Sequence, residues 1–162
     1  MHKLSSIVGL TYMSSPLGKV CLATSNKGIC LISVSDNIQQ PAFNEKHPYL
    51  LQCIQELNEY FGHERSEFDM PIDISFGTNF MQSVWEALLA IPYGTTQSYG
   101  QVAHQIHRPN ASRAVGMGCG KNQLWVVVPC HRVVGSTGKL TGYAGGLDVK
   151  EWLLEHEQKK EK

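Results

Sequence analysis

One cysteine, Cys130, stands where it could act as a nucleophile. The apolar run Leu124–Val128 is typical of a buried strand, Pro129 closes it, and His131 and Arg132 follow the cysteine directly. The thiolate is the reactive form of cysteine, neighbouring cations lower the pKa of a thiol, and an apolar wall excludes competing water. We therefore predict that Cys130 is a nucleophile whose pKa is lowered by its basic neighbours.

The other four cysteines give weaker signals. Cys21, Cys30 and Cys53 lie within ordinary strand or helix patterns and are typical of inert core thiols, while Cys119 is ambiguous. Five is an odd number of cysteines, and a chain of 162 residues is long enough to bury its own core. We therefore expect free thiols in a reducing, cytoplasmic setting rather than a disulfide scaffold.

The charge of the chain is segregated although it sums to zero. Residues 87–147 contain no Asp or Glu, whereas acidic residues gather between positions 56 and 73. The acid-free window contains Arg108, Arg113, Lys121, Arg132 and Lys139. A net charge of zero argues against a general nucleic-acid binder, but this segregation focuses positive potential on one part of the surface and favours an anionic partner.

The elements that would position these residues fall into two parts. Residues 7–13, 20–24 and 29–34 are strand-like and are joined by Pro- and Gly-containing turns, and residues 50–61 repeat apolar positions at helical spacing. These patterns predict a β-meander followed by a helix in an N-terminal lobe over residues 1–75. The polar, acidic segment 64–77 is the best boundary between the two parts.

With 42% apolar and 17% charged residues, a disordered chain is excluded, and neither a signal peptide nor a membrane span is expected.

The second half, residues 76–162, has the spacing of short helices. Asn79 stands where a cap belongs before an amphipathic helix over 80–89, and Ser98 with Gln101 matches a capping box before another helix. The turn at 108–110 and a helix over 111–119 complete a helix-turn-helix pattern. Helical hairpins are also common in proteins that never meet DNA.

The last of these helices is unusually slim. Its small residues are Ala111, Ser112, Ala114, Gly116 and Gly118, around a single Arg113. Since glycine costs about 1 kcal/mol in a helix, close approach to another backbone is one explanation. One interpretation is that the glycines pack against another element of the fold. The other is that the helix enters a minor groove and Arg113 reaches into the base stack.

Several segments together point to a family. In chain order they are Phe80–Trp85, Ile91–Thr96, Ser98–Gly100, Ser112–Gly116, Asn122, Pro129–Val133, Tyr143–Leu147 and Lys150–Leu154. This set resembles the O6-alkylguanine-DNA alkyltransferases, closely over residues 76–157 and more loosely at Ser14–Gly18. The resemblance implies an α+β fold with a small, ribonuclease-H-like N-terminal α/β lobe and a helical C-terminal lobe that carries the helix-turn-helix.

The resemblance also implies a reaction and the residues that perform it. Cys130 would accept the alkyl group from O6-alkylguanine, and from O4-alkylthymine, in a single irreversible turnover. The implied catalytic residues are Cys130, His131, Glu157, Asn122 and Tyr99. His131 would reach the thiol through a water and pair with Glu157, Asn122 would brace the turn, and Tyr99 would help to rotate the nucleotide and donate to the leaving base.

Binding residues and partners follow from the same resemblance. The implied DNA contacts are Arg113, Tyr99, Ser112, Ala114 and Gly116, and the implied pocket walls are Trp125, Val133, Tyr143 and Ala144. We expect a monomer that binds double-stranded DNA in the minor groove, acts in the cytoplasm at the nucleoid, has no membrane partner and needs no cofactor. An alkylated base hides its substituent inside the duplex, so it must be everted at a cost of a few kcal/mol.

Two features depart from those of other family members, and one pair of histidines suggests a metal site. Many relatives have Pro after the bracing asparagine, whereas this chain has Gln123. Some relatives carry a zinc in the N-terminal lobe, but the matching positions here lack Cys and His, so no zinc is expected. His104 and His107, three residues apart, could form half of a metal site, although an exposed helix face is the favoured interpretation.

Three other functions remain open. A thiol hydrolase using Cys130, His131 and Glu157 would turn over repeatedly on a small acyl substrate. A lesion-binding protein would flip alkylguanine without transferring the group, but relatives of that kind lack the acceptor cysteine. A regulatory helix-turn-helix protein is disfavoured because the slim helix lacks the Gln, Asn and Arg cluster expected for major-groove readout.

Overall fold

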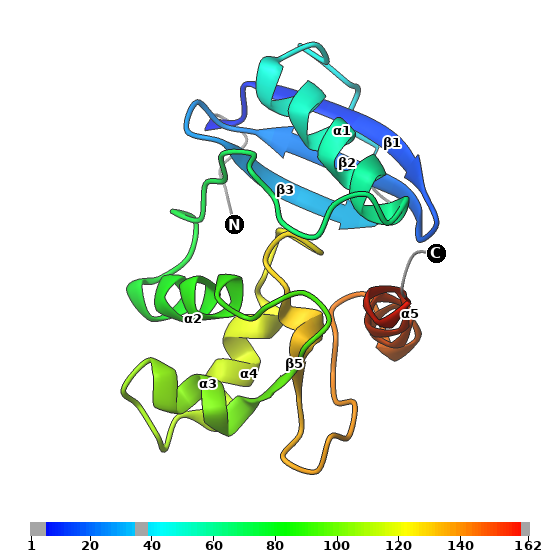
Figure 1. Ribbon diagram of the computed structural model, residues 1–162. Helices are drawn as coiled ribbons and strands as arrows, with labels where there is room; N and C mark the ends of the chain where they lie inside the picture. Colours follow the sequence, from blue (N-terminus) through cyan, green and yellow to red (C-terminus); the bar gives the residue numbers. More distant parts are fainter. Residues whose placement is uncertain (1–5, 35–38, 160–162) are drawn as a thin grey trace. The chain divides into compact units, whose positions relative to one another are not determined.

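The computed structural model describes residues 6–34 and 39–159 of the chain (Figure 1). The chain divides into two compact units, residues 1–76 and residues 77–162. Among the described helices, none has the length and apolarity that crossing a membrane requires.

The first unit is a three-stranded antiparallel sheet covered on one face by a helix. The strands β1 (Gly9–Ser15), β2 (Gly18–Thr24) and β3 (Ile29–Val34) are neighbours in sequence order, and α1 (Pro48–Phe61) crosses the sheet (Figure 1). This confirms the predicted meander and helix, although β1 begins two residues later than expected. The strand then runs on to Ser15, where the tight turn places Ser15 opposite Gly18.

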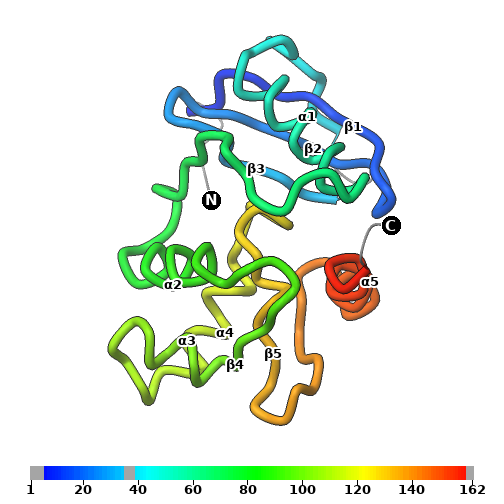
Figure 2. Tube along the Cα trace, in the orientation of Figure 1, coloured from blue at the N-terminus to red at the C-terminus, as the bar shows by residue number. Residues whose placement is uncertain are grey.

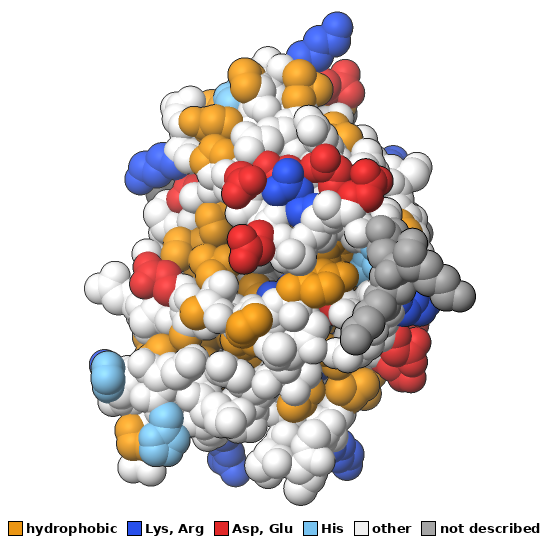
Figure 3. All heavy atoms as spheres, in the orientation of Figure 1, with side chains coloured by type: hydrophobic (Ala, Val, Ile, Leu, Met, Phe, Trp, Pro, Cys, Tyr) orange, Lys and Arg blue, Asp and Glu red, His pale blue; other side chains and the backbone are white. Residues whose placement is uncertain are grey.

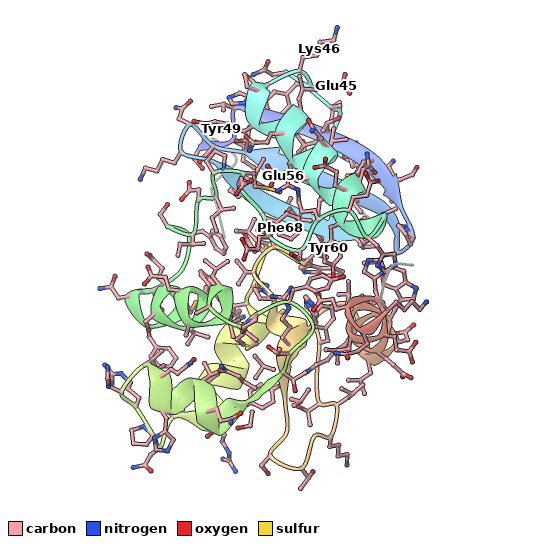
Figure 4. All side chains as sticks on the ribbon, viewed as in Figure 1. Glu45, Lys46, Tyr49, Glu56, Tyr60 and Phe68 are labelled. Atoms are coloured by element: carbon pink, nitrogen blue, oxygen red, sulfur yellow. The ribbon has the colours of Figure 1, made fainter. Side chains whose placement is uncertain are left out.

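Burial of one face of α1 holds this unit together. Leu50, Cys53, Leu57 and Tyr60 recur at helical spacing and are at most 1% exposed, so α1 presents a continuous apolar stripe to the sheet. The Tyr60 ring packs against Phe68, from the segment that follows the helix, with centroids 5.5 Å apart (Figure 4). Pro48 at the start of the helix and Gly62 at its C-cap set its ends.

Over its described residues 77–159, the second unit contains four helices and one short parallel strand pair. Its helices are α2 (Asn79–Leu89), α3 (Tyr99–Gln105), α4 (Ser112–Gly120) and α5 (Leu147–Gln158). The strands β4 (Gln97–Ser98) and β5 (Val133–Val134) lie side by side (Figure 2), and the single 3-10 turn η2 (Cys130–Arg132) leads directly into β5. The two short helices α3 and α4 of the predicted helix-turn-helix are present, and the capping box of Ser98 and Gln101 is formed.

Two local predictions were wrong. The cap of α2 is Thr78 rather than Asn79, because the Thr78 hydroxyl accepts the backbone N–H of Met81 at 3.2 Å. The run Leu124–Val128 is buried at all but one position but forms turns rather than a strand. Its backbone groups bond within the loop, Val128 N–H to Leu124 O at 3.0 Å, and Val126 adopts a positive φ of 72°. Apolarity predicted the burial of this run, but burial alone does not distinguish a strand from a coiled loop.

Candidate active site

Asn122 organises the loop that presents Cys130. Its side-chain carbonyl oxygen accepts the backbone N–H of Leu124 at 2.9 Å, and its amide donates to the carbonyl oxygen of Val128 at 2.8 Å. One buried side chain therefore closes the loop from both ends. The same amide lies 3.3 Å from the Cys130 sulfur, to which it donates a weak hydrogen bond. This placement matches the bracing position that the family resemblance implied for Asn122.

The Cys130 thiol is buried, and the prediction of a lowered pKa was wrong. Cys130 is 4% exposed, and burial raises its pKa above the ordinary thiol value, only partly offset by the Asn122 hydrogen bond and the charge of Lys150. Of its two basic neighbours in sequence, Arg132 donates to Glu157 and His131 is held neutral. The thiol therefore keeps its proton in the resting protein and needs a base to become nucleophilic.

A hydrogen-bonded array of three buried residues, His131, Arg132 and Glu157, contains an imidazole that can act as a base. His131 Nε2 lies 2.7 Å from Glu157 Oε2, and Arg132 donates to both oxygens of the same carboxylate, at 2.8 and 3.0 Å. Burial alone would raise the pKa of the Glu157 carboxyl, but the His131 and Arg132 hydrogen bonds and the Arg132 charge hold it well below its usual range. Glu157 is consequently an anion and can only accept hydrogen bonds.

The ionised Glu157 determines which nitrogen of His131 is basic. Because a carboxylate only accepts, Nε2 of His131 must carry the proton that bridges them. Burial lowers the pKa of His131 despite the opposing effect of Glu157, so the ring is neutral and Nδ1 has a free lone pair. Nδ1 is buried and has no hydrogen-bond partner in the described part of the chain. A buried lone pair with no partner is suited to accepting a proton through one bridging water.

Cys130 opens into a cavity of about 610 Å³. The walls come from α3, α4, the η2 turn and the loop before α5, and consist of Tyr99, Ser112, Arg113, Gly116, Cys119, Gly120, Cys130, Thr141, Gly142, Tyr143 and Ala144. The cavity thus brings together residues that are far apart in sequence. The Tyr143 hydroxyl has no conventional hydrogen-bond partner among the described residues, and its pKa is raised first by burial and then by the neighbouring Cys130 thiol.

Two of the expected pocket residues do not line this cavity. Trp125 stands behind Tyr143, with ring centroids 5.8 Å apart, and Val133 is fully buried in β5, where it pairs with Gln97. Tyr143 and Ala144 do line the cavity. Trp125 therefore supports the cavity wall by packing against the Tyr143 ring. Val133 supports it as part of β5, the strand that follows the η2 turn.

The packing explanation for the glycines of the slim helix α4 holds for one of them. A Cβ at Gly118 would lie 3.5 Å from Val84 of α2, so this glycine packs against another element of the unit. Gly116 lines the cavity, and Gly120 has no neighbour within 4 Å of a Cβ position. Arg113 is exposed and also lines the cavity, whereas Ala114 does not line it.

The basic residues of the acid-free window divide into two groups. Arg108, Arg113, Lys121 and Lys139 are exposed, while Arg132 is 6% exposed and neutralised by Glu157. On the face drawn in Figure 3, acidic side chains gather over α1 and the segment after it, in the first unit. The exposed positive charge of the second unit is therefore smaller than the sequence count suggests, but the segregation itself persists.

Two residues of the site escaped sequence reasoning as functional residues. Lys150 is fully buried, and its Nζ donates to the carbonyl oxygen of Thr141 at 2.8 Å and contacts the Tyr99 hydroxyl at 3.5 Å. Thr141 lines the cavity and donates to the same hydroxyl at 3.0 Å. Lys150 belongs to a motif that resembles the family, so the signal was present. Nothing in the sequence indicated that the side chain of this lysine would be buried.

The remaining candidates have structural placements. All five cysteines are free, and burial raises the pKa of Cys30 and of Cys119 to about 12. His104 and His107 are exposed, as the favoured interpretation predicted. Within residues 6–34 and 39–159, no group of three or more His, Cys, Asp or Glu side chains could hold a metal ion.

Comparison with known families matches nearly the whole chain. Residues 79–159 match the DNA binding domain of 6-O-methylguanine DNA methyltransferase, and residues 9–74 match the ribonuclease-like domain of the same family. The chain is 43% identical over 149 residues to the methylated-DNA–protein-cysteine methyltransferase of Mycobacterium tuberculosis, covering 90% of each chain. It is 42% identical over 147 residues to that of Methanosarcina acetivorans, covering 88% of this chain and 94% of the relative.

Solved structures give the same picture. The crystal structure of Mycobacterium tuberculosis OGT in complex with DNA aligns with a TM-score of 0.80 at 42% identity, over 91% of both chains. The O6-methylguanine-DNA methyltransferase of Pyrococcus kodakaraensis aligns with a TM-score of 0.54 at 23% identity, which reflects a shared fold. The α+β architecture expected from the sequence, with a ribonuclease-like first part, is confirmed.

Proposed function

The chain belongs to the 6-O-methylguanine DNA methyltransferase family, and we propose that Cys130 is its acceptor, with His131 and Glu157 as the relay that activates it. The activity is transfer of a methyl group from methylated DNA to a cysteine of the protein itself, which repairs the DNA by direct reversal. The observation that carries the assignment of residues is that Cys130 lines the cavity beside α4, while its sequence neighbour His131 is buried and hydrogen-bonded to Glu157.

The proposed step is an in-line displacement at a saturated carbon. The thiol proton passes through a water to Nδ1 of His131, the sulfur attacks the methyl carbon, and the bond from that carbon to guanine O6 breaks. The Tyr99 hydroxyl on the wall of the cavity donates a hydrogen bond to the leaving base, which takes up a proton from water, and His131 returns its proton to water. The thioether that forms has no carbonyl for water to attack, so each molecule acts once and no cofactor enters the step.

Access to the thiol requires that the damaged nucleotide leaves the duplex. We propose that α4 enters the minor groove and that Arg113, which is exposed and lines the cavity, fills the vacated position in the base stack. Ser112, Gly116 and Tyr99 also line the cavity and would pass the nucleotide inward. We further propose that the protein acts as a monomer on O6-alkylguanine and O4-alkylthymine, in the reducing cytoplasm that its five free thiols suit.

Intact-mass measurement tests the acceptor directly. After incubation with a duplex containing O6-methylguanine, the protein should gain the mass of one methyl group, located on Cys130 by peptide mapping. Cys130→Ala should bind the lesion and gain nothing, while the matched Cys119→Ser should still gain one methyl group on Cys130. Transfer by Cys130→Ala, label on Cys119, or repeated turnover as in a thiol hydrolase would contradict the assignment. Binding without transfer by the unaltered chain would identify a lesion-binding protein.

A second experiment tests the role of Arg113. Arg113→Ala should slow repair of a methylated duplex far more than reaction with free O6-methylguanine base, because only the duplex requires eversion. Lys139→Ala, which removes an exposed charge outside the cavity lining, serves as the control for loss of general attraction to DNA. Equal losses by Arg113→Ala on duplex and free base would rule out the proposed insertion into the base stack.

A further inference from the structure

Behind the cavity wall, in contact with the lining residues Tyr99, Thr141 and Gly142, lies a buried cation that the proposed reaction leaves without a role. Lys150 lies in the first turn of α5 and is fully buried, and no carboxylate of the described residues lies within 4.0 Å of its Nζ. Its partners are the carbonyl oxygens of Thr141 and Gly142, at 2.8 and 3.4 Å, and the Tyr99 hydroxyl at 3.5 Å. Burying a charge without a counter-ion costs free energy, so a role for Lys150 beside Tyr99 and Thr141 would explain why a lysine stands here.

The contacts of Lys150 restrict what the Tyr99 hydroxyl can do. An ammonium group only donates hydrogen bonds, so the Tyr99 oxygen must accept from Lys150. The Thr141 hydroxyl lies 3.0 Å from the same oxygen, and Tyr99 is its only hydrogen-bond partner in the described chain. With Lys150 and Thr141 both donating, the lone pairs of the Tyr99 oxygen are occupied and its own proton has no acceptor among the described residues.

The direction left for the Tyr99 proton is the cavity that Tyr99 lines. Burial raises the pKa of Tyr99, with the Thr141 hydrogen bond opposing it, so the phenol retains its proton near neutral pH. We propose that Thr141 and Lys150 are positioning residues that hold the Tyr99 hydroxyl as a hydrogen-bond donor aimed at the everted base. The inference rests on the proposed function of Tyr99 and adds the groups that determine its orientation.

The arrangement matters because a phenol can be either donor or acceptor. Without the two donors, the Tyr99 proton could turn toward Thr141 or water, and the leaving base would lose its hydrogen-bond donor in part of the molecules. A preoriented donor costs no reorganisation when charge develops on the leaving oxygen. The effect should therefore appear in the rate of methyl transfer after the base has entered the cavity.

A double-mutant cycle tests the inference on the full chain. Thr141→Val keeps the shape of the side chain and removes the hydroxyl, so transfer in a single turnover should slow by about twofold to tenfold, the range for one neutral hydrogen bond. Thr141→Ser retains the hydroxyl and should restore the rate. In a Tyr99→Phe background, Thr141→Val should cause no further loss, because its effect passes through the missing phenol oxygen.

Lys150→Met, which removes the charge at similar length, should slow transfer by about tenfold to hundredfold, and this loss should also shrink in the Tyr99→Phe background. The midpoint of thermal unfolding shows whether each variant is folded. If Lys150→Met does not fold, the inference is tested by the rates of Thr141→Val alone. The inference would be overturned if Thr141→Val slowed transfer equally with and without the Tyr99 hydroxyl, or did not slow it at all. It would also be overturned if Thr141→Ser failed to restore the transfer rate. Failure of the proposed function is distinct, because the unaltered chain would then gain no methyl group on Cys130.

Discussion

Each unit of the molecule buries a thiol and a carboxylate, but only one pair is equipped for chemistry. In the first unit, Cys53 and Glu56 lie three residues apart on α1, and burial followed by the charge of Glu56 raises the pKa of the Cys53 thiol. In the second unit, Cys130 and Glu157 come from separate elements and His131 lies hydrogen-bonded to Glu157. The types of group are the same, so the difference lies in what surrounds them.

The partners of the two carboxylates explain the difference. Glu56 accepts the backbone N–H groups of Asp69 and Met70, at 2.7 and 3.2 Å, and the side-chain amide of Gln52 at 2.7 Å (Figure 4). None of these donors can take up or release a proton near neutral pH, so Glu56 pins a loop to α1. Glu157 instead accepts from an imidazole whose other nitrogen is unpartnered. A carboxylate becomes part of a proton relay only when its donor can titrate.

The largest expected effect comes from neutralising the two carboxylates in turn. Glu157→Gln removes the charge that sets the tautomer of His131, so methyl transfer per folded molecule should fall by about a hundredfold or more. Glu56→Gln should leave that rate within about twofold, while lowering the free energy of unfolding by about 1 to 3 kcal/mol through lost hydrogen bonds. Single-turnover assays normalised to folded protein measure the first quantity, and urea unfolding the second. A loss of rate from Glu56→Gln comparable to that from Glu157→Gln would remove the distinction between the units.

A smaller effect should follow from removing the arginine beside each carboxylate. The Arg132 side chain is 7% exposed, and Arg132→Ala takes from the buried Glu157 both hydrogen bonds that it accepts from the guanidinium, which should cost about 3 to 5 kcal/mol of unfolding free energy. Arg65 pairs with Glu59 and Asp69 at the surface, where water and salt screen the attraction, so Arg65→Ala should shift the unfolding midpoint much less. Chemical denaturation of both variants makes the comparison. A greater loss from Arg65→Ala would mean that the surface network, not the buried array, stabilises the molecule.

The smallest effect concerns pH. His131 has a lowered pKa in the folded chain, so below about pH 6.5 the unfolded chain binds more protons and the second unit loses stability as pH falls. Glu157, also lowered, adds a further loss below about pH 4.5. The raised thiol pKa values of both units act in the opposite sense, so stability is lost above about pH 9 in both.

The three tryptophans, Trp85, Trp125 and Trp152, all belong to the second unit and report on it alone. No histidine in the described part of the first unit is buried, so its hydrogen-exchange protection factors, corrected for the intrinsic pH dependence of amide exchange, should stay constant in mild acid while the tryptophan fluorescence of the second unit shifts. The transfer rate should hold down to about pH 6.5 and fall only in more acidic solution, where His131 gains its proton. Equal acid sensitivity of the two units, or a rate that falls well above pH 6.5, would contradict the neutral His131.

The sequence by itself determined the identity of the acceptor candidate, most of the secondary structure and the family. The meander, the α1 and α3 helices and the capping box follow from local periodicity and turn chemistry, which act over a few residues. The motif around Cys130 and the segregation of charge are likewise properties of the chain alone. The cap of α2 was missed because two adjacent residues, Thr78 and Asn79, could both cap the helix, and the loop at 124–128 because an apolar run predicts burial without distinguishing a strand from a loop.

Only the tertiary structure decided the electrostatics of the site. The sequence places Arg132 two residues from Cys130 and predicts a lowered thiol pKa, but Arg132 turns to Glu157, twenty-five positions away, and burial raises the pKa instead. The inward turn of Lys150 and its meeting with Thr141 and Tyr99 likewise join residues from three distant segments. Desolvation and charge pairing depend on distance in space, and a linear order of residues does not contain those distances until the chain has packed.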